Sequence, residues 1–175
     1  MNEDGVSLGL RQATLQLTSH DPAWSSAFTA EAARIRAALP DLTFKIDHIG
    51  STAVPGLPAK AILDIAMRAE ARDWDHIAGA LIGLGYIDRG IRSGRLFIRL
   101  RDGDVRTHNL HLYSLQDHDC RDQIAFRDAL RADPDLRDQY ARLKQGLVDR
   151  LGNAGRGSYA DGKTDFVRAA TKQAS

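Results

Sequence analysis

The fold is decided by one stretch of sequence, Asp47-His48-Ile49-Gly50-Ser51-Thr52-Ala53-Val54-Pro55-Gly56-Leu57-Pro58-Ala59-Lys60, with Ile62-Leu63-Asp64-Ile65 directly after it. Residues 43–49 alternate as a strand does, with every second side chain on one face. The next eleven residues hold two glycines and two prolines, the composition of a shaped loop. Residues 61–67 are apolar except for Asp64, which predicts a central strand buried on both faces.

Asp64 is the residue of this stretch with the clearest chemical implication. A carboxylate inside an apolar strand is costly to bury without a partner. It is either structural, capping a loop or pairing with an arginine, or it is a ligand of Mg²⁺, which prefers hard oxygen donors.

The turn Gly50-Ser51-Thr52 allows two interpretations as well. It is either an ordinary glycine turn or a site where backbone N–H groups face an anion. A Walker loop is excluded, because Pro55 follows Gly50 by five positions and Lys60 does not follow a glycine. A nucleophile elbow is excluded too, because Gly-x-Ser-x-Gly is absent around Ser51.

Periodicity and capping signals outline the rest of the chain. They predict a short edge strand over 14–18, strands over 95–101 and 105–113 joined by a two-residue turn at Asp102-Gly103, and helices over 22–39, 74–84, 117–130, 134–151 and 157–171. We therefore expect an α+β fold, a small mixed β-sheet with helices followed by a C-terminal helical part. After a loose start over 1–13, one domain covers 14–175, with its sheet part over 14–116 and its helical part over 117–171.

Composition narrows the functional classes. The 175 residues are 43% hydrophobic and 27% charged, which suits one globular domain. The single cysteine, Cys120, excludes a disulfide framework and a cysteine-rich zinc site. A formal net charge of +1 argues against a nucleic-acid partner. With no membrane-length apolar run and no secretory signal at the start, we expect a cytoplasmic protein without a membrane partner.

The order of strand, Gly-Ser turn and Asp-bearing strand resembles the nucleotidyltransferase pattern. In that superfamily the Gly-Ser holds a triphosphate, and an Asp-x-Asp pair on the next strand holds magnesium. Here Ala66 occupies the position of the second aspartate.

The whole stretch 47–65 resembles more closely the signature of the GrpB-like family. Four further segments agree with it, namely Asp21-Pro22 with Trp24, Arg95-Leu96-Phe97, Arg106-Thr107-His108-Asn109-Leu110-His111, and Tyr159 with Lys163 and Phe166. The resemblance spans about 14–171 and implies a fold of nucleotidyltransferase type. The family itself lacks the second aspartate, and related domains occur fused to dephospho-CoA kinase. Asn109 is a local departure, since the family often has a further histidine there.

The histidines of the strand 105–113 are candidates of a weaker kind. His108 and His111 lie three apart, so a regular strand sends them to opposite faces and makes them a poor pair for one metal unless a bulge intervenes. Either can be an ordinary hydrogen-bonded core residue. By the resemblance, this strand lies where nucleotidyltransferases place a third catalytic carboxylate, which would make His111 a base or a metal ligand. His48 could instead orient the Gly-Ser loop.

Four cationic residues are candidates for anion binding. A two-residue turn at 102–103 would place Arg99 opposite Arg106, which forms either a solvated face or an anion site. Lys163 lies on the apolar side of the last helix, where it either reaches water or meets a phosphate in a cleft. Lys60, at the end of the loop, is the fourth candidate.

The leading hypothesis is therefore a Mg²⁺-dependent nucleotidyltransferase that uses an NTP and a small-molecule acceptor. Asp64 would bind Mg²⁺, and the catalytic residues would be Asp64, His111 and His108, with Asp47 or His111 compensating for Ala66. The nucleotide would be held by Gly50, Ser51, Thr52, Lys60, Arg99, Arg106 and Lys163. The alternative is a non-catalytic nucleotide- or CoA-binding module that has lost the second carboxylate. A metal-dependent hydrolase using the two strand histidines is disfavoured by their spacing.

Overall fold

The computed structural model describes residues 7–153 and 158–173. In chain order its elements are β1 (Leu10–Arg11), α1 (Ala23–Ala38), β2 (Lys45–Ile49), the 3₁₀ turn η1 (Ser51–Ala53), β3 (Leu63–Ala69), the 3₁₀ turn η2 (Ala71–Asp73), α2 (Trp74–Gly83), β4 (Tyr86–Arg92), β5 (Gly94–Arg101), β6 (Val105–Ser114), α3 (His118–Ala132), α4 (Pro134–Leu151), α5 (Ser158–Asp161) and α6 (Thr164–Gln173).

The strands form one mixed sheet in the order β2-β3-β6-β5-β4, and β1 adds a short pair to β6. β3 and β6 run parallel, whereas the other neighbouring pairs are antiparallel. Within β3 the side chains of Leu63, Ile65, Ala66 and Met67 are fully buried, as expected for a strand covered on both faces. The predicted α+β class with a small mixed sheet is confirmed.

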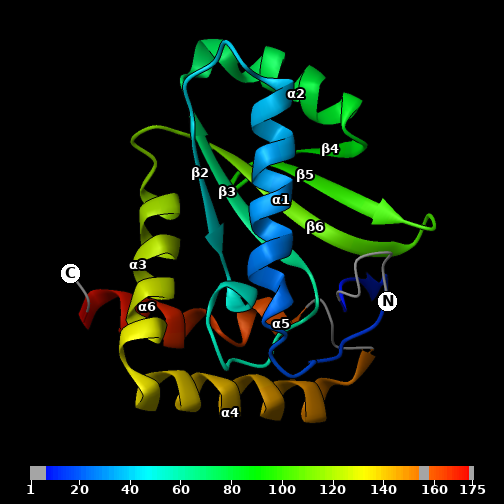
Figure 1. Cartoon of the computed structure of the whole chain (residues 1–175). Coiled ribbons are helices and arrows are strands. Elements are labelled where there is room, and N and C mark those ends of the chain that lie inside the picture. Colours follow the sequence, from blue (N-terminus) through cyan, green and yellow to red (C-terminus); the bar gives the residue numbers. More distant parts are fainter. Residues whose placement is uncertain (1–6, 154–157, 174–175) are drawn as a thin grey trace.

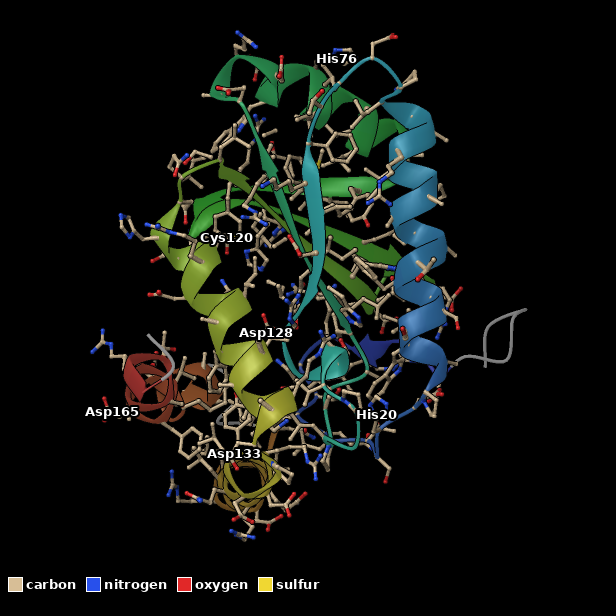
Figure 2. All side chains as sticks on the ribbon, turned by 60° about the vertical axis from the view of Figure 1, so that its left-hand side comes forward. His20, His76, Cys120, Asp128, Asp133 and Asp165 are labelled. Atoms are coloured by element: carbon tan, nitrogen blue, oxygen red, sulfur yellow. The ribbon has the colours of Figure 1, made fainter. Side chains whose placement is uncertain are left out.

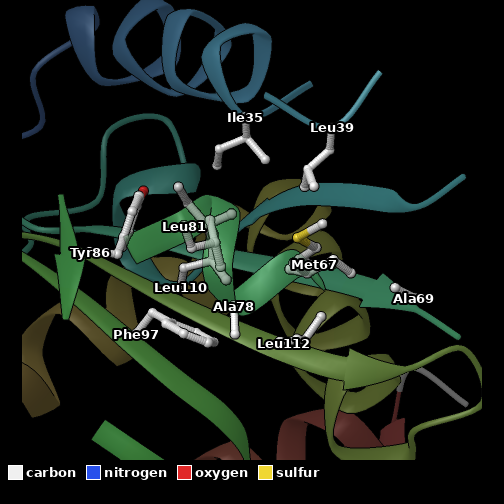
Figure 3. Close-up of a cluster of buried hydrophobic side chains, with 12 residues drawn as sticks. Ile35, Leu39, Met67, Ala69, Ala78, Leu81, Tyr86, Phe97, Leu110 and Leu112 are labelled. Atoms are coloured by element: carbon white, nitrogen blue, oxygen red, sulfur yellow. The ribbon is translucent and has the colours of Figure 1, made fainter. Parts of the chain in front are cut away.

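Helices cover both faces of this sheet (Figures 1 and 2). α1 and α2 lie on one face, where Ile35, Leu81, Met67 and Leu110 belong to the largest apolar cluster (Figure 3). α3 lies on the opposite face, where its buried Cys120 packs in a smaller cluster. The sheet is therefore a layer between two helical layers. One face of β3 and β6 packs against α1 and α2, and the other face packs against α3.

The last three helices gather around the loop 50–60 at one end of the sheet (Figure 1). Val54 and Leu57 of the loop are fully buried against Leu130 of α3 and Tyr140 of α4. The stability of the loop therefore depends on the C-terminal helices, which form a wall beside the sheet.

Two predictions at the N-terminal end are wrong. No strand forms over 14–18, where Thr18 makes only an isolated bridge with Ala59. The strand lies instead at Leu10–Arg11, and Leu8 and Leu10 are buried, so the expectation of a loose start does not hold for these residues. Residues 1–6 lie outside the described residues.

The strand β4 is not predicted from the sequence, because its residues lack regular alternation. Its pairing with β5 shifts register between Asp88 and Ile91, with Gly90 in the left-handed region at a φ of 76°. Ile87 and Ile91 are exposed, as is common on the last strand of a sheet. Buried and exposed residues therefore do not alternate along β4, and the segment lacks the pattern by which a strand is predicted.

The predicted helix over 157–171 is interrupted in the structure. α5 ends at Asp161 and α6 begins at Thr164, with Gly162 between them. A Cβ at Gly162 would lie 2.6 Å from a methyl carbon of Leu147, so the chain passes close to α4 here and a larger residue would displace the Leu147 side chain. Gly157, the predicted start of the helix, lies outside the described residues.

The hairpin between β5 and β6 also differs from the prediction. Three residues, 102–104, connect the strands, and the register shifts after Arg99, which pairs with His108 rather than with Arg106. The expected direct opposition of the two arginines is wrong, because the extra residue forms a bulge.

Across the described ranges 7–153 and 158–173, no helix has the length and apolar character needed to cross a bilayer.

Candidate functional site

A cavity of about 410 Å³ lies between the loop 50–60, the strands β3 and β6, and the C-terminal helices. Seven of the residues predicted from the sequence line it, namely Gly50, Ser51, Thr52 and Lys60 from the loop, Asp64 from β3, His111 from β6 and Lys163 from the turn between α5 and α6. The predicted grouping of Ser51 and Asp64 with one strand histidine is thus present in the structure. The chemical role of each residue remains a prediction.

Gly50 and Asp64 form the closest approach in this wall. Ile49 and Asp64 are register partners in the pair β2–β3, so the turn that follows Ile49 passes directly beside the carboxylate. Gly50 has a φ of 70° and a ψ of −171°, and a Cβ there would lie 2.7 Å from Oδ2 of Asp64. Only glycine fits both this backbone conformation and this contact.

Two arginines of α3 hold the main chain of the loop. Arg127 donates to the carbonyl of His48 at 2.9 Å, and Arg131 donates to the carbonyl of Ala53 at 2.9 Å. The ring of His48 lies 3.0 Å from the hydroxyl of Thr52, which supports the predicted orienting role of this histidine. Burial and the charges of the two arginines lower the pKa of His48 to about 4, so the ring is neutral at neutral pH.

Lys144 of α4 contacts both Ser51 and the far end of the loop. Its ammonium group donates to Oγ of Ser51 at 3.1 Å and to the carbonyl of Pro58. The side chain is 1% exposed. Burial, together with the charges of Lys163 and Lys60, lowers the pKa of Lys144 to about 7.

Lys60 and Lys163 meet at the ring of Tyr159. Their amino groups lie 5.3 Å and 4.4 Å from the ring centroid. Burial and the charge of Lys60 lower the pKa of Lys163 to about 8, whereas the Asp64 carboxylate opposes this shift. Three lysines from distant parts of the chain therefore converge on one cavity, at an electrostatic cost that an anion would relieve.

The opposite side of the cavity is formed by β3 and β6. Asn109 donates from Nδ2 to Oδ1 of Asp64 at 2.7 Å, because the two residues are register partners in the parallel pair. His111 stacks on Tyr113 with ring centroids 5.9 Å apart, and its Nδ1 lies 3.3 Å from the carbonyl oxygen of Ser93. This wall offers a carboxylate, an amide and an imidazole to a ligand.

Three predicted site residues do not line the cavity. Arg99 forms an ion pair with Glu31 of α1 at 2.8 Å, on the other side of the sheet. His108 is buried near the ring of Tyr86, with ring centroids 6.2 Å apart, and burial lowers its pKa to about 4. Both side chains point toward α1 because strand alternation puts them on the face opposite Asn109.

Arg106 is the third of these residues. Its guanidinium lies 3.5 Å from Oδ1 of Asn109. Asn109 lines the cavity, so Arg106 lies behind this residue rather than in the cavity wall itself. The bulge at Thr107 determines where Arg106 lies, because it pairs Arg106 with Leu100 of β5 instead of with Arg99.

The side chains present do not fit a Mg²⁺ ion held by the protein alone. Asp64 is the carboxylate of the cavity, and Ala66 is buried in the place of a second one. Asp47 is the register partner of Ala66, but it pairs with Arg68 at 2.8 Å. In the part of the chain that the structure describes, no three His, Cys, Asp or Glu residues gather as metal ligands would. The described lining of the cavity instead holds more lysines than carboxylates.

Sequence reasoning misses Lys144, although the sequence contains a signal for it. Lys144 follows Tyr140 by four residues and precedes Leu147 by three, so it lies on the apolar stripe of α4 rather than on its solvent face. A lysine in such a stripe must be buried or must reach around the helix. Asn109 stands out in the sequence only as a departure from a histidine, and the arginines of α3 carry no periodic signal.

The sequence of this chain matches a known protein family. The sequence profile described as "GrpB protein" matches residues 14–173. The chain belongs to the GrpB family. A UPF0157 protein of Halalkalibacterium halodurans is 36% identical to this GrpB-family chain over 164 residues, which cover 93% of this chain and 83% of that protein. A dephospho-CoA kinase of Mycobacterium leprae is 28% identical over 189 residues, covering 90% of this chain and 46% of the kinase.

A solved structure of the same family is similar to this chain. The crystal structure of the conserved protein GrpB from Enterococcus faecalis superposes with a TM-score of 0.77 at 28% identity, covering 91% of this GrpB-family chain and 96% of that one. The Cid1 poly(U) polymerase bound to MgATP superposes with a TM-score of 0.45 at 11% identity, covering 73% of this chain and 45% of the polymerase.

Proposed function

We propose that this protein binds the phosphate groups of a nucleotide-type ligand in the cavity beside Ser51. The observation that carries the proposal is the convergence of Lys60, Lys144 and Lys163 on a cavity that contains one carboxylate, Asp64. Ammonium groups crowded together in a buried site repel one another, and a polyphosphate would offset this repulsion while it accepts their hydrogen bonds.

Two relatives have names that agree with this class of ligand, and the match covers 46% and 20% of their length. Among the relatives are chains named dephospho-CoA kinase, a name that specifies a phosphorylated, nucleotide-containing compound. A nucleoside triphosphate and CoA therefore are the two ligands to test first. Binding without turnover is the simplest form of this function, since the cavity offers more cations than acids.

Replacing Lys163 with methionine is expected to weaken the binding of ATP or CoA about 10- to 100-fold. The reason is that a hydrogen bond to a charged group contributes about 1.5–3 kcal/mol. Isothermal titration calorimetry without metal measures the change. Lys45→Met removes an exposed lysine of β2 and should bind as the wild type does. Equal affinities of the Lys163 variant and the wild type, or no binding by the wild type, would contradict the proposal.

Nucleotidyl transfer with Mg²⁺ is the second candidate. The observation in its favour is the contact between the Asp64 carboxylate and the Gly50 turn, since the phosphates of an NTP bound at the turn would lie beside this carboxylate. One or two carboxylates together with substrate phosphates are a usual set of Mg²⁺ ligands. In this candidate the remaining ligands come from the substrate, and the small-molecule acceptor enters beside His111.

The variant Asp64→Asn separates the two candidates. Removing a carboxylate from an anion site should strengthen metal-free ATP binding several-fold, because the repulsion between carboxylate and phosphate disappears. Stability without metal should stay within about 1 kcal/mol of the wild type, since Asp64 is held by an amide and not by an arginine. If the protein is a Mg²⁺-dependent transferase, the same variant instead loses the gain in affinity that Mg²⁺ gives. Titrations with and without Mg²⁺, with the exposed Asp41→Asn as control, measure both effects.

A further inference from the structure

We propose that Ser51 and Lys144 form a nucleophile–base pair, and that Ser51 accepts the terminal phosphoryl group of a nucleoside triphosphate bound in the cavity. This inference rests on the proposed phosphate binding. It adds to that function a covalent step on the protein itself, at a serine that lines the cavity.

The geometry of the pair is that of an activated hydroxyl. Oγ of Ser51 lies 3.1 Å from Nζ of Lys144, within reach of a proton transfer. Lys144 is held in turn by the carbonyl of Pro58 and lies 4.9 Å from the ring centroid of Tyr140. A nucleophile, a base and a third group that orients the base are the arrangement by which serine hydroxyls are activated.

The surroundings of Lys144 favour its neutral form. The charged and titratable groups that face it are Lys163 from the α5–α6 turn, Lys60 from the loop, and Tyr140 from its own helix. With the side chain 1% exposed and two like charges near it, a large share of the amine is unprotonated at neutral pH. The lone pair of that neutral amine can accept the hydroxyl proton, while the N–H groups still donate to Pro58.

The position of Lys144 also selects the phosphorus atom. It is the most buried of the three lysines, so the end of a phosphate chain that reaches it is the terminal phosphoryl group. In the step, the bond from Oγ of Ser51 to that phosphorus forms. The bond from the phosphorus to the bridging oxygen breaks, and its electron pair leaves with the nucleoside diphosphate. The hydroxyl proton moves to Nζ of Lys144, which leaves phosphoserine beside three cations.

Mass spectrometry of the full chain after incubation with ATP and Mg²⁺ tests this inference. We expect a mass gain of one phosphoryl group, located on Ser51 in the digested protein, together with release of ADP. Ser51→Ala should show no gain, even at nucleotide concentrations that saturate the variant as judged by titration with a non-hydrolysable ATP analogue. Ser25→Ala, at an exposed serine of α1, should be labelled as the wild type is.

Variants of the base give an independent readout. Lys144→Arg keeps the positive charge but has no neutral form at working pH, so we expect labelling at saturating nucleotide to slow at least about 100-fold. Lys144→Met, which also removes the charge, serves if the arginine variant has a lowered melting temperature. At saturating nucleotide the wild-type rate should rise with pH as the amine of Lys144 loses its proton, and the rise should lie above the pKa of about 7 of the ligand-free protein because bound phosphates favour the charged amine.

The outcomes separate this inference from the proposed function. If the analogue binds but the protein gains no mass, gains a nucleotidyl group or is labelled elsewhere, the nucleophile–base pair is refuted while phosphate binding stands. A rate that is flat with pH, or unchanged in Lys144→Arg, also refutes it. If neither ATP nor the analogue binds at all, the proposed function fails first.

Discussion

Gly50→Ala is expected to abolish ATP binding. It should also destabilise the protein by more than the cost of the strained backbone conformation alone. The φ and ψ of Gly50 lie in a region open essentially to glycine, which costs other residues about 1–3 kcal/mol. The new Cβ would also displace the carboxylate of Asp64, whose Oδ2 lies 2.7 Å from its position. The turn and the acid would then both leave their places in the cavity wall.

Urea unfolding and calorimetry with ATP measure these two losses. Gly79→Ala is the matched control, because Gly79 lies inside α2 with no atom within 4 Å of a new Cβ. This control should bind ATP normally and gain up to about 1 kcal/mol of stability. A Gly50 variant as stable as the wild type, with its affinity intact, would show that the turn does not form the site.

Glu31→Gln is expected to cost about 3 kcal/mol of stability at neutral pH, with little effect on ligand binding. Glu31 is 6% exposed and accepts hydrogen bonds from Arg34, Tyr86 and Arg99, which join α1 to β4 and β5. Burial alone would raise the pKa of Glu31, but these partners outweigh it and lower the pKa from 4.5 to about 2. A shift of this size corresponds to about 3 kcal/mol at 1.36 kcal/mol for each pKa unit.

The pH dependence follows from the direction of that shift. Because the folded-state pKa is depressed, the stabilisation is fully present above pH 4.5 and is lost as pH falls toward 2. The difference in unfolding free energy between wild type and Glu31→Gln should therefore shrink over this range. The exposed Glu70→Gln should track the wild type throughout. A constant difference from pH 7 to pH 2 would mean that the carboxylate charge is not the cause.

Local sequence pattern is sufficient to predict the central strands and one wall of the site. The order of strand, loop and Asp-bearing strand, together with the family pattern, predicts that Gly50, Ser51 and Asp64 lie close together, and the three residues line one cavity. These features are close in sequence, since one loop joins two strands that pair with each other.

Local pattern fails where a single extra residue changes the register. The bulge between β5 and β6 moves Arg99 away from Arg106 and toward Glu31 of α1. The alternation of apolar and polar residues does not predict such a bulge, because it continues unchanged within the strand segment on each side of the extra residue. The contacts of Lys144, unlike its place on the apolar stripe of α4, cannot be predicted locally, since its partners lie 86 and 93 residues away in the chain.

The parallel pairing of β3 with β6 has a consequence for how the molecule folds. Asp64 and Asn109 are 45 residues apart and become neighbours only when these two strands align. Closing a loop of that length costs on the order of 3 kcal/mol of chain entropy, whereas the β5–β6 hairpin closes over three residues. We therefore expect the hairpin to form early and β3 to join it later, so that the cavity beside Ser51 is among the last parts of the fold to form.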